Sequence, residues 1–312
     1  MKISIDGGAL YPKNNQRFGT SVFSENLVTA LKRYDKKNQY FIYTFKNLKP
    51  KLFWLKGRVS IEEFINKKVV FLALNQAIPL YTSGKVISFC HGLSYYFYSQ
   101  YYPKNDYIRL NNQLKEMIKK SDKIIVSSEK VKEELISIYR YIEAKIIVLP
   151  FGIPFDMKKR SAFVKTTADR QKFFLFVGMN HPIKNINFIK KAFNEFKKDE
   201  GYKDHKLYIL TENVSRKKLK KFYQQATALL TASYYESFNF PVLEALSQDC
   251  PVIGLKSAII PELRPYVNVA GNNKEFVEFM KKINTKPDVQ LINQLCKTFN
   301  WENYISNLVK LY

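Results

Sequence analysis

Short apolar segments alternate with amphipathic segments along most of the chain, and this alternation restricts the fold more than any other feature. Short runs of apolar and β-branched residues are typical of buried strands, whereas apolar residues at helical spacing indicate amphipathic helices. A repeated strand–helix order predicts parallel, doubly wound sheets in an α/β protein. The predicted strands are 2–6, 40–45, 69–74, 86–89, 124–127, 146–149, 173–177, 207–210, 228–230 and 252–254, and the predicted helices include 21–33, 185–198 and 216–223.

The 312 residues suffice for two domains of about 150 residues each. Residues 156–172 are polar and basic without a clear period, which predicts a linker. We therefore expect two Rossmann-like domains, 1–155 and 173–299, that face each other across a cleft, with ligands at the carboxyl ends of the strands. Residues 300–312 are predicted to form a C-terminal helix, for which packing on the N-terminal domain is one option.

Composition excludes several classes of protein. Cys90, Cys250 and Cys296 show no metal-ligand spacing, and with three histidines in the chain we expect no metal site and a reducing compartment. No apolar run approaches the roughly 18 residues of a membrane span, and the first residues predict a strand, not a targeting segment. We expect a cytoplasmic protein, either free or peripheral on the inner face of the membrane.

The formal net charge is +24, which is compatible with nucleic acid, an anionic membrane surface or an acidic acceptor as partner. The basic residues occur mostly as scattered pairs, and no DNA- or RNA-reading motif accompanies them, so no nucleic-acid partner is expected. AT-rich codon usage is another source of the many lysines. A few charges near an anionic leaflet, each worth up to about 1 kcal/mol, suffice for peripheral binding.

The segment 236–253, ESFNFPVLEALSQDCPVI, carries two glutamates eight positions apart. Pro241 predicts the start of a helix, because proline fits the first helical turn. Glu236 is then on a loop, and Glu244 lies one turn inside the helix, near the end that favours phosphorylated ligands. Carboxylates there can accept hydrogen bonds from sugar and ribose hydroxyl groups. The alternative, two solvated surface glutamates, remains in a chain with 27 acidic residues.

The glutamate pair resembles the Glu-x-seven-Glu signature of the retaining "group 1" glycosyltransferases, which have the two-domain GT-B fold. The resemblance covers nearly the whole chain, although the first domain is short, mainly between Lys46 and Val86. The other segments that resemble the family are VISFCHGLSYYFYSQYYP, SDKIIVSSEKVKEEL, KIIVLPFGIP, FLFVGMNHPIKN and TFNWENYISNLVKLY.

The resemblance implies a role for several residues. His91 would lie beside the transferred sugar, bonding to it or to the phosphate, and would form the catalytic set together with Glu236. Lys184 would neutralise the leaving diphosphate, and Glu244 would hold the ribose. The other implied donor-binding residues are Gly19, Gly178, Ser237, Phe238 and Asn239.

The chain departs from the family pattern where relatives carry an arginine, since Met179 and Ile183 occupy those positions. Either Lys184 acts alone, or Asn180, His181 or Arg216 assists it, or the donor binds weakly. Ser237 and Asn239 replace the usual glycines of the signature, so we expect their side chains to intrude on the sugar site. The tyrosine-rich run 95–102 has three readings: a platform that stacks on a sugar acceptor, a membrane interface, or a packed loop.

The resemblance implies a hexosyltransferase that moves a sugar from a nucleotide-sugar to a saccharide or lipid-linked saccharide, with retention of configuration. It implies neither a metal ion nor a cofactor, because protein cations take the metal's role and the nucleotide-sugar is a co-substrate. The alternative is a catalytically degenerate GT-B scaffold that binds a partner. A glycoside hydrolase also needs two carboxylates, but they must flank one glycosidic bond, which fits this loop and helix start less well.

Overall fold

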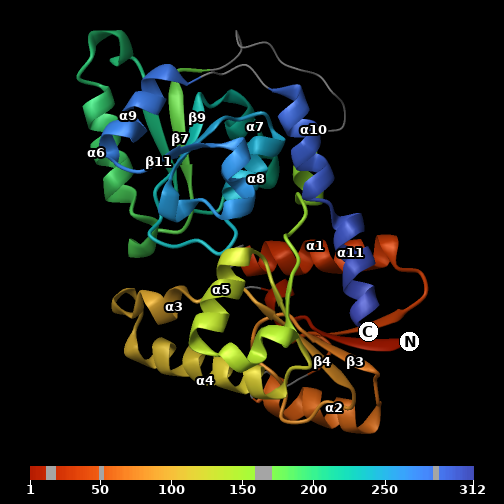
Figure 1. Ribbon diagram of the computed structural model, residues 1–312. Helices are drawn as coiled ribbons and strands as arrows, with labels where there is room; N and C mark the ends of the chain where they lie inside the picture. Colours follow the sequence, from red (N-terminus) through yellow and green to blue (C-terminus); the bar gives the residue numbers. More distant parts are fainter. Residues whose placement is uncertain (12–18, 49–52, 159–170, 284–287) are drawn as a thin grey trace. The chain divides into compact units, whose positions relative to one another are not determined.

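The computed structural model describes residues 1–11, 19–48, 53–158, 171–283 and 288–312. The chain forms two compact units. Figure 1 shows them, with colours that follow the residue number. Unit 1 comprises Met1–Phe151 together with Trp301–Tyr312, and unit 2 comprises Gly152–Asn300. Residues 159–170, which make up most of the predicted linker, lie outside the described part of the chain.

Unit 1 contains a parallel sheet with the strand order β2-β1-β3-β4-β5-β6 among the described residues. The strands are β1 (Lys2–Asp6), β2 (Gln39–Tyr43), β3 (Val70–Ala73), β4 (Lys85–Cys90), β5 (Lys123–Val126) and β6 (Ile146–Val148). The helices are α1 (Gly19–Tyr34), α2 (Ser60–Ile65), α3 (Ser94–Phe97), α4 (Lys104–Lys120), α5 (Glu129–Ile138) and α11 (Trp301–Leu308).

Helices cover both faces of this sheet because its strands are apolar on both sides. Cys90 belongs to a core shared with Met117 of α4 and Leu135 of α5. Phe89, on the opposite face, packs on Phe23 of α1 with ring centroids 5.4 Å apart. Trp301 of α11 packs on the same ring of Phe23. The last helix of the chain therefore belongs to the core of the first unit.

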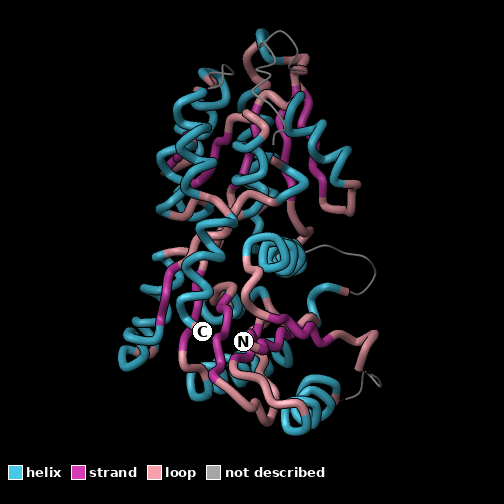
Figure 2. Tube along the Cα trace, turned by 90° about the vertical axis from the view of Figure 1, so that its right-hand side faces the viewer, coloured by secondary structure: helices cyan, strands magenta, loops and turns pink. Residues whose placement is uncertain are grey.

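Unit 2 contains a second parallel sheet, with the order β11-β10-β9-β7-β8 among the described residues. Its strands are β7 (Phe173–Val177), β8 (Lys206–Leu210), β9 (Ala228–Thr231), β10 (Val252–Leu255) and β11 (Asn268–Ala270). Its helices are α6 (Ile186–Phe196), α7 (Arg216–Gln225), α8 (Phe240–Ser247), α9 (Asn273–Lys282) and α10 (Val289–Thr298). Figure 2 shows the strands in magenta between cyan helices in both units.

Two Rossmann-like units confirm the predicted fold class. Each predicted strand has a counterpart in the structure, displaced by a residue or two at its ends. No strand was predicted at β11, which has only three residues and a polar start. The sequence favours a helical tail over 273–312 with breaks near Pro287 and Asn300, and the first of these breaks falls in residues 284–287, outside the described part.

Candidate functional site

Polar residues of unit 2 follow three strands that are neighbours in the sheet, β9, β7 and β8. Gly178 directly follows β7, Arg216 begins α7 after β8, and Glu236 lies on the loop after β9. The carboxyl ends of parallel strands meet at one edge of a sheet, which is where ligands bind in folds of this kind. The sequence-predicted donor residues of this unit are therefore brought to one edge.

Lys184 and Glu236 form an ion pair at this edge. Lys184 ends a short 3-10 turn, Pro182–Lys184, and its Nζ lies 2.6 Å from Oε1 of Glu236. The hydroxyl of Ser233 donates to the same oxygen over 2.7 Å. Both charged side chains are largely but not fully buried, so a ligand can reach them. A backbone hydrogen bond from Tyr234 to Ile183 fastens the two loops together.

Glu244 is held by a second cation. It lies one turn inside α8, which begins at Phe240, and only 3% of the residue is exposed. Nη2 of Arg216 donates to its Oε1 over 2.7 Å, and the hydroxyl of Tyr223 donates to its Oε2 over 3.1 Å. Arg216 also makes a two-pronged contact with Asp156, through Nε at 2.7 Å and Nη2 at 2.9 Å. Arg216 thus links two carboxylates.

Burial and the neighbouring cation shift the pKa of Glu244 in opposite directions. Burial raises the pKa of Glu244 above its ordinary value, while the charge of Arg216 and the hydrogen bonds from Arg216 and Tyr223 oppose that rise. Burial by itself lowers the pKa of Arg216, but the hydrogen bond to Asp156 and the charge of Glu244 outweigh it, so the net shift is upward. A guanidinium fork is well suited to pairing with carboxylates in such a partly buried position.

The sequence left open which residue assists Lys184. The two positions at which relatives carry an arginine differ in their surroundings. Ile183 is buried, whereas Met179 is largely exposed. The imidazole Nδ1 of His181 accepts from the backbone N–H of Ile183 over 3.3 Å. Of the three residues considered, Arg216 forms an ion pair with a signature glutamate, Glu244. Its partners Asp156 and Tyr223, like Ser233 beside Glu236, were not identified from the sequence.

Asn239, one of the two residues that replace glycines of the signature, differs from the expectation. Asn239 has a left-handed backbone, with φ of 69°, a region that glycine and asparagine enter most readily. Its amide donates to Oγ1 of Thr231 and to the carbonyl of Ala258, so the side chain turns into the protein and does not intrude on the site. Phe238 is buried against Phe240 and contributes packing. Ser237 is half-buried on the same loop.

Gly178 is restricted by its neighbours as well. Its N–H donates to the carbonyl of Leu210 over 3.1 Å, and a Cβ at this position would lie 3.0 Å from the ring of Phe176. A side chain here would therefore have to displace an aromatic ring that is itself buried.

In unit 1, His91 directly follows β4 at the carboxyl end of the sheet. Its Nε2 lies 2.6 Å from the carbonyl oxygen of Leu74, and since a carbonyl only accepts, Nε2 must carry the proton. Burial lowers the pKa of His91 to about 4, although the hydrogen bond to Leu74 opposes this. The imidazole is therefore neutral at pH 7, and Nδ1 is an acceptor. Gly19 is the exposed first residue of α1, and the residues just before it lie outside the described part.

Asp6, at the carboxyl end of β1, is a buried carboxylate that the sequence did not single out. Its Oδ1 accepts from the backbone N–H of Gly8 over 2.9 Å, and its Oδ2 lies 3.5 Å from the amide nitrogen of Asn75. Burial raises the pKa of Asp6 to about 6, against the effect of these two hydrogen bonds. Because Asn75 adjoins Leu74, the hydrogen-bonding partner of His91, both titratable groups lie at the same sheet edge.

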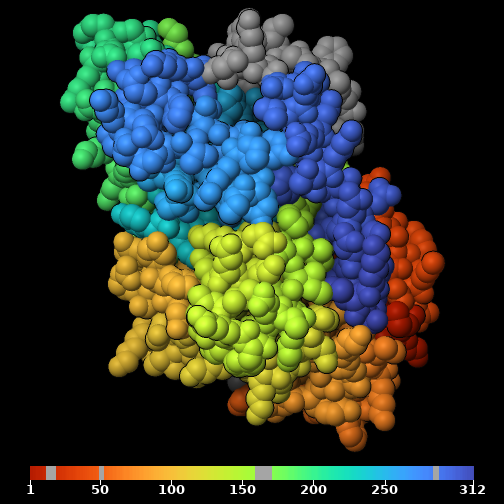
Figure 3. Space-filling view, in the orientation of Figure 1, coloured from red at the N-terminus to blue at the C-terminus, as the bar shows by residue number. Residues whose placement is uncertain are grey.

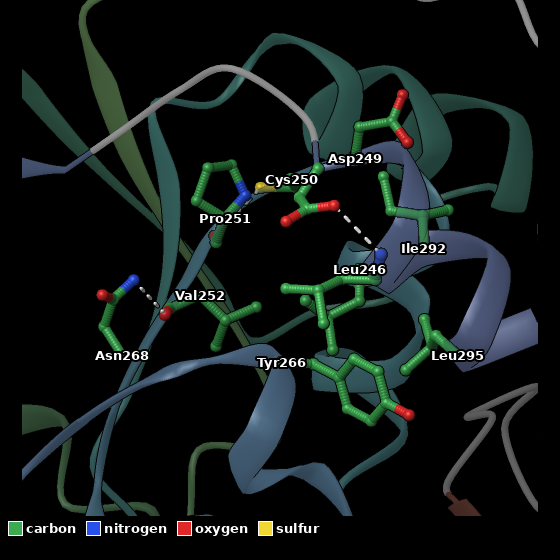
Figure 4. Close-up of a pocket in the computed structure, with 11 residues that line it drawn as sticks. Leu246, Asp249, Cys250, Pro251, Val252, Tyr266, Asn268, Ile292 and Leu295 are labelled. Atoms are coloured by element: carbon green, nitrogen blue, oxygen red, sulfur yellow. Dashed lines mark hydrogen bonds between the residues drawn. The ribbon is translucent and has the colours of Figure 1, made fainter. Parts of the chain in front are cut away.

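A separate pocket in unit 2 lies at the amino end of β10, away from the glutamates (Figure 4). Leu246, Ile292 and Leu295 line it together with Tyr266, and the amide of Asn268 donates to the carbonyl of Val252. Its lining is mainly apolar and includes neither signature glutamate. In the ranges that the structure describes, no group of three or more His, Cys, Asp or Glu could hold a metal ion, and no helix is long and apolar enough to span a membrane.

Two family profiles match the chain. The one described as "Glycosyltransferase Family 4" matches residues 66–156, and the one described as "Glycosyl transferases group 1" matches residues 204–287. The second match includes both signature glutamates and Arg216. The first includes His91.

Individual proteins show the same likeness. The chain is 26% identical over 278 residues to the O-antigen chain mannosyltransferase RfbU of Salmonella typhimurium, which covers 80% of this chain and 74% of that relative. Its fold is similar to that of sucrose-phosphate synthase from Thermosynechococcus elongatus, with a TM-score of 0.72 at 14% identity over 100% of this chain and 98% of the other. HepE of Anabaena in complex with UDP-glucose gives a TM-score of 0.69 at 10% identity, over 100% and 99% of the two chains.

Proposed function

Because the chain belongs to the group 1 glycosyltransferases of the GT-B fold, we propose that it moves a hexose from a nucleotide-sugar to a saccharide or lipid-linked saccharide, with retention and without a metal ion. The observation that carries the proposal is the pair of carboxylate–cation contacts at one sheet edge of unit 2, Lys184 with Glu236 and Arg216 with Glu244. A donor of this class presents hydroxyl groups and a diphosphate, which these groups complement.

Each group has a distinct task in this proposal. The ammonium of Lys184 binds the diphosphate and stabilises the negative charge that grows on it as the bond to the sugar breaks. Glu236 accepts hydrogen bonds from sugar hydroxyl groups, and Glu244 accepts them from the ribose. The sugar passes through an oxocarbenium-like state, and exclusion of water protects it from hydrolysis. Lys184 neutralises Glu236 before the donor binds and the diphosphate afterwards, so it takes the place of a metal cation.

His91 is better suited to a sugar hydroxyl than to a phosphate. Its low pKa keeps it uncharged at neutral pH, so it offers no positive charge to a phosphate. Its Nδ1 can accept a hydrogen bond, and the hydrogen bond from Nε2 to Leu74 fixes the ring in one tautomer. We therefore assign His91 to the transferred sugar, as an acceptor that requires no change of protonation.

The acceptor we propose is a saccharide of the O-antigen or lipopolysaccharide type, in keeping with the name of the RfbU relative. Peripheral binding to the inner face of an anionic membrane would suit a lipid-linked form. A group of exposed apolar side chains supports this location, and we call it the α2 patch: Ile61, Phe64, Ile65, Leu80 and Tyr81.

Two members of the α2 patch are in contact, and the patch has basic neighbours. The rings of Phe64 and Tyr81 lie 5.7 Å apart, which joins α2 to the loop before β4. Arg58 and Lys67, also exposed, flank it along the chain. Residues 53–81, orange in Figure 3, reach the surface of unit 1. Apolar side chains with adjacent cations are typical of surfaces that bind anionic bilayers.

A scaffold without catalysis is the alternative reading, and it rests on Met179 and Ile183. It is less favoured, because Lys184 and Arg216 both keep a cation beside a signature carboxylate. The two readings differ in turnover, since a scaffold can bind the donor but cannot transfer the sugar.

The test combines donor binding with turnover. Thermal shift against UDP, GDP and ADP and their hexose conjugates identifies the donor, since about 100 times Kd of ligand adds about 2.7 kcal/mol of stability. We expect Lys184→Met and Glu244→Gln to abolish the shift and the transfer of labelled sugar. Lys190→Met and Glu195→Gln, on the exposed side of α6, are the matched controls and should retain both. Binding without transfer to any acceptor would favour the scaffold, and no binding at all would refute the donor site.

A further inference from the structure

Exposed aromatic side chains gather on unit 1 shortly after His91. α3 begins three positions after this histidine, and it carries Tyr96, which is 37% exposed, and Phe97, which is 42% exposed. Tyr141, after α5, is 77% exposed. Large aromatic residues contribute most to stability when they are buried. A cluster of them on the surface indicates a site of interaction.

The aromatic side chains come from two segments but lie together. The rings of Tyr139 and Tyr141 are 6.3 Å apart in an edge-to-face arrangement, and those of Tyr96 and Phe97 are 5.3 Å apart. Burial raises the pKa of Tyr139, and the nearby hydroxyl groups of Tyr96 and Tyr141 raise it further. Tyr139 also packs against the core cluster that contains Tyr95, the residue before Tyr96, so the two segments meet there. We call Tyr96, Phe97, Tyr139 and Tyr141 the aromatic surface.

The aromatic surface stands on a fixed base. Tyr95, between His91 and the exposed rings, is buried in the core of unit 1, and its hydroxyl points to Oε1 of Gln76 over 3.5 Å. The hydroxyl groups of Ser94 and Tyr102 lie 2.6 Å apart and tie the start of α3 to the segment before α4. A ligand that binds here would not have to order α3, which preserves affinity.

The chemistry of the surface is closer to that of a saccharide than to that of a lipid. A pyranose ring has a face of C–H groups and a rim of hydroxyl groups, and a tyrosine offers an apolar ring face with one hydroxyl at its edge. Three of the four residues are tyrosines. The α2 patch of the same unit differs, because isoleucine and leucine supply three of its five side chains. The two surfaces thus offer different chemistry.

We propose that the aromatic surface binds the saccharide chain of the acceptor, beyond the sugar that receives the transferred hexose. The proposal rests on the transferase function above and names the part of the substrate that this function leaves undefined. His91 contacts the transferred sugar in that function, and α3 leads from His91 to the aromatic surface within one short segment. An acceptor of several sugars would extend along this segment.

The experiment compares full-length Tyr96→Ser/Tyr141→Ser with the matched control Phe64→Ser/Tyr81→Ser, which removes two exposed rings from the α2 patch. Tyr139 is left intact because it is partly buried in the core. The probes are mannose oligosaccharides of two to five units, with binding measured by calorimetry in the absence of donor. We expect the aromatic-surface variant to lose affinity for the longer probes at least tenfold, while the control retains it.

Donor binding provides the independent readout. The thermal shift produced by the nucleotide-sugar should be unchanged in both variants, so a failure of the donor site is distinguishable from a failure of this proposal. Equal saccharide affinity in the variant and the parent chain would overturn the proposal, as would failure of the parent chain to bind any probe on this series or on a broader glycan array. Loss of vesicle binding by the aromatic-surface variant, with glycan binding intact, would assign the surface to a bilayer instead and also overturn it.

Discussion

Nη2 of Arg216 lies 2.7 Å from Oε1 of Glu244, so a cation from the start of one helix neutralises a carboxylate buried inside another. The same guanidinium contacts Asp156, which follows the division between the two units at Phe151 and Gly152. Arg216 therefore controls both the charge and the orientation of Glu244.

Replacing Arg216 should make donor binding more sensitive to acid. Burial raises the pKa of Glu244 and Arg216 opposes the rise, so Arg216→Met raises this pKa further. In the proposed function the ribose binds to the ionised carboxylate of Glu244, so the loss of donor binding on acidification should begin at a higher pH in the variant. Donor Kd measured from pH 5 to pH 8 checks this. Arg216→Lys, which keeps the charge, should show a smaller displacement, and coincident profiles for all three proteins would contradict the role.

Substituting His91 should reduce activity by the same factor at acid and neutral pH. His91→Phe keeps the packing on Phe23, whose ring is 5.0 Å away, and removes the acceptor Nδ1. An unmade hydrogen bond to a buried hydroxyl costs about 1–3 kcal/mol, so kcat/KM should fall roughly 5-fold to 150-fold. Because the pKa is about 4, the ratio of variant to parent should not change between pH 5.5 and pH 8. A ratio that changes near pH 6.5 would show that the charged form takes part.

Asp6→Asn should stabilise unit 1 at neutral pH. The folded pKa of Asp6, about 6, exceeds the value of 3.8 expected for the unfolded chain, so its contribution is fully present below pH 3.8 and is lost as pH rises through 6. A pKa difference of about two units corresponds to about 3 kcal/mol of unfolding free energy. The amide of asparagine does not ionise, so the variant does not lose this free energy at neutral pH. Urea unfolding at pH 4 and pH 7 should show the advantage of the variant growing with pH. Asp106→Asn, at the surface of the same unit, is the control.

Trp301→Ala should destabilise unit 1 and leave unit 2 unaffected. Trp301 is fully buried, and its ring lies 5.2 Å from that of Tyr304 and 6.1 Å from that of Phe23. Truncating a buried tryptophan costs about 3–5 kcal/mol. Hydrogen exchange resolved by residue should accelerate in β1 and α1 but not in β7 and β9. Ser306→Ala, on the exposed side of α11, is the control, and faster exchange in unit 2 would contradict the division of the chain.

Phe64→Ser/Ile65→Ser should weaken binding to vesicles that contain anionic lipid. Both side chains are exposed on α2, and each buried CH₂ contributes about 0.8 kcal/mol to membrane partitioning. We expect at least a tenfold loss in a flotation assay, and weaker binding of the parent chain at high salt. Tyr141→Ser removes an exposed ring from the aromatic surface and should have no effect. If the parent chain shows no preference for anionic over neutral vesicles, the α2 patch does not bind the membrane.

Local patterns in the sequence were enough to predict the parallel sheets and the place of Glu236. Buried strands such as 173–177 are continuous apolar runs, and Pro241 marks the start of α8, so each of these signals lies within a few residues of the feature it predicts. The resemblance to the family identified Lys184, and the structure pairs it with Glu236, which is 52 positions away.

The rest depended on contacts that no local pattern records. Arg216 meets Glu244 and Asp156 across 28 and 60 positions, whereas the sequence named it only as one of three residues that could assist Lys184. Asp6 ends a strand like many surface residues, and only the packing around it shows that it is buried. Asn239 was expected to intrude on the sugar site, but its left-handed backbone turns the amide toward Thr231 and Ala258.

The return of α11 to unit 1 has a consequence for synthesis on the ribosome. Trp301 and Tyr304 complete a core around Phe23 and Phe151, yet they are translated after every residue of unit 2. The second unit has all of its residues once Asn300 has emerged, whereas the first must wait with an open aromatic core. The core of unit 1 is therefore completed only after all residues of unit 2 have been translated, and α11 is the element that completes it.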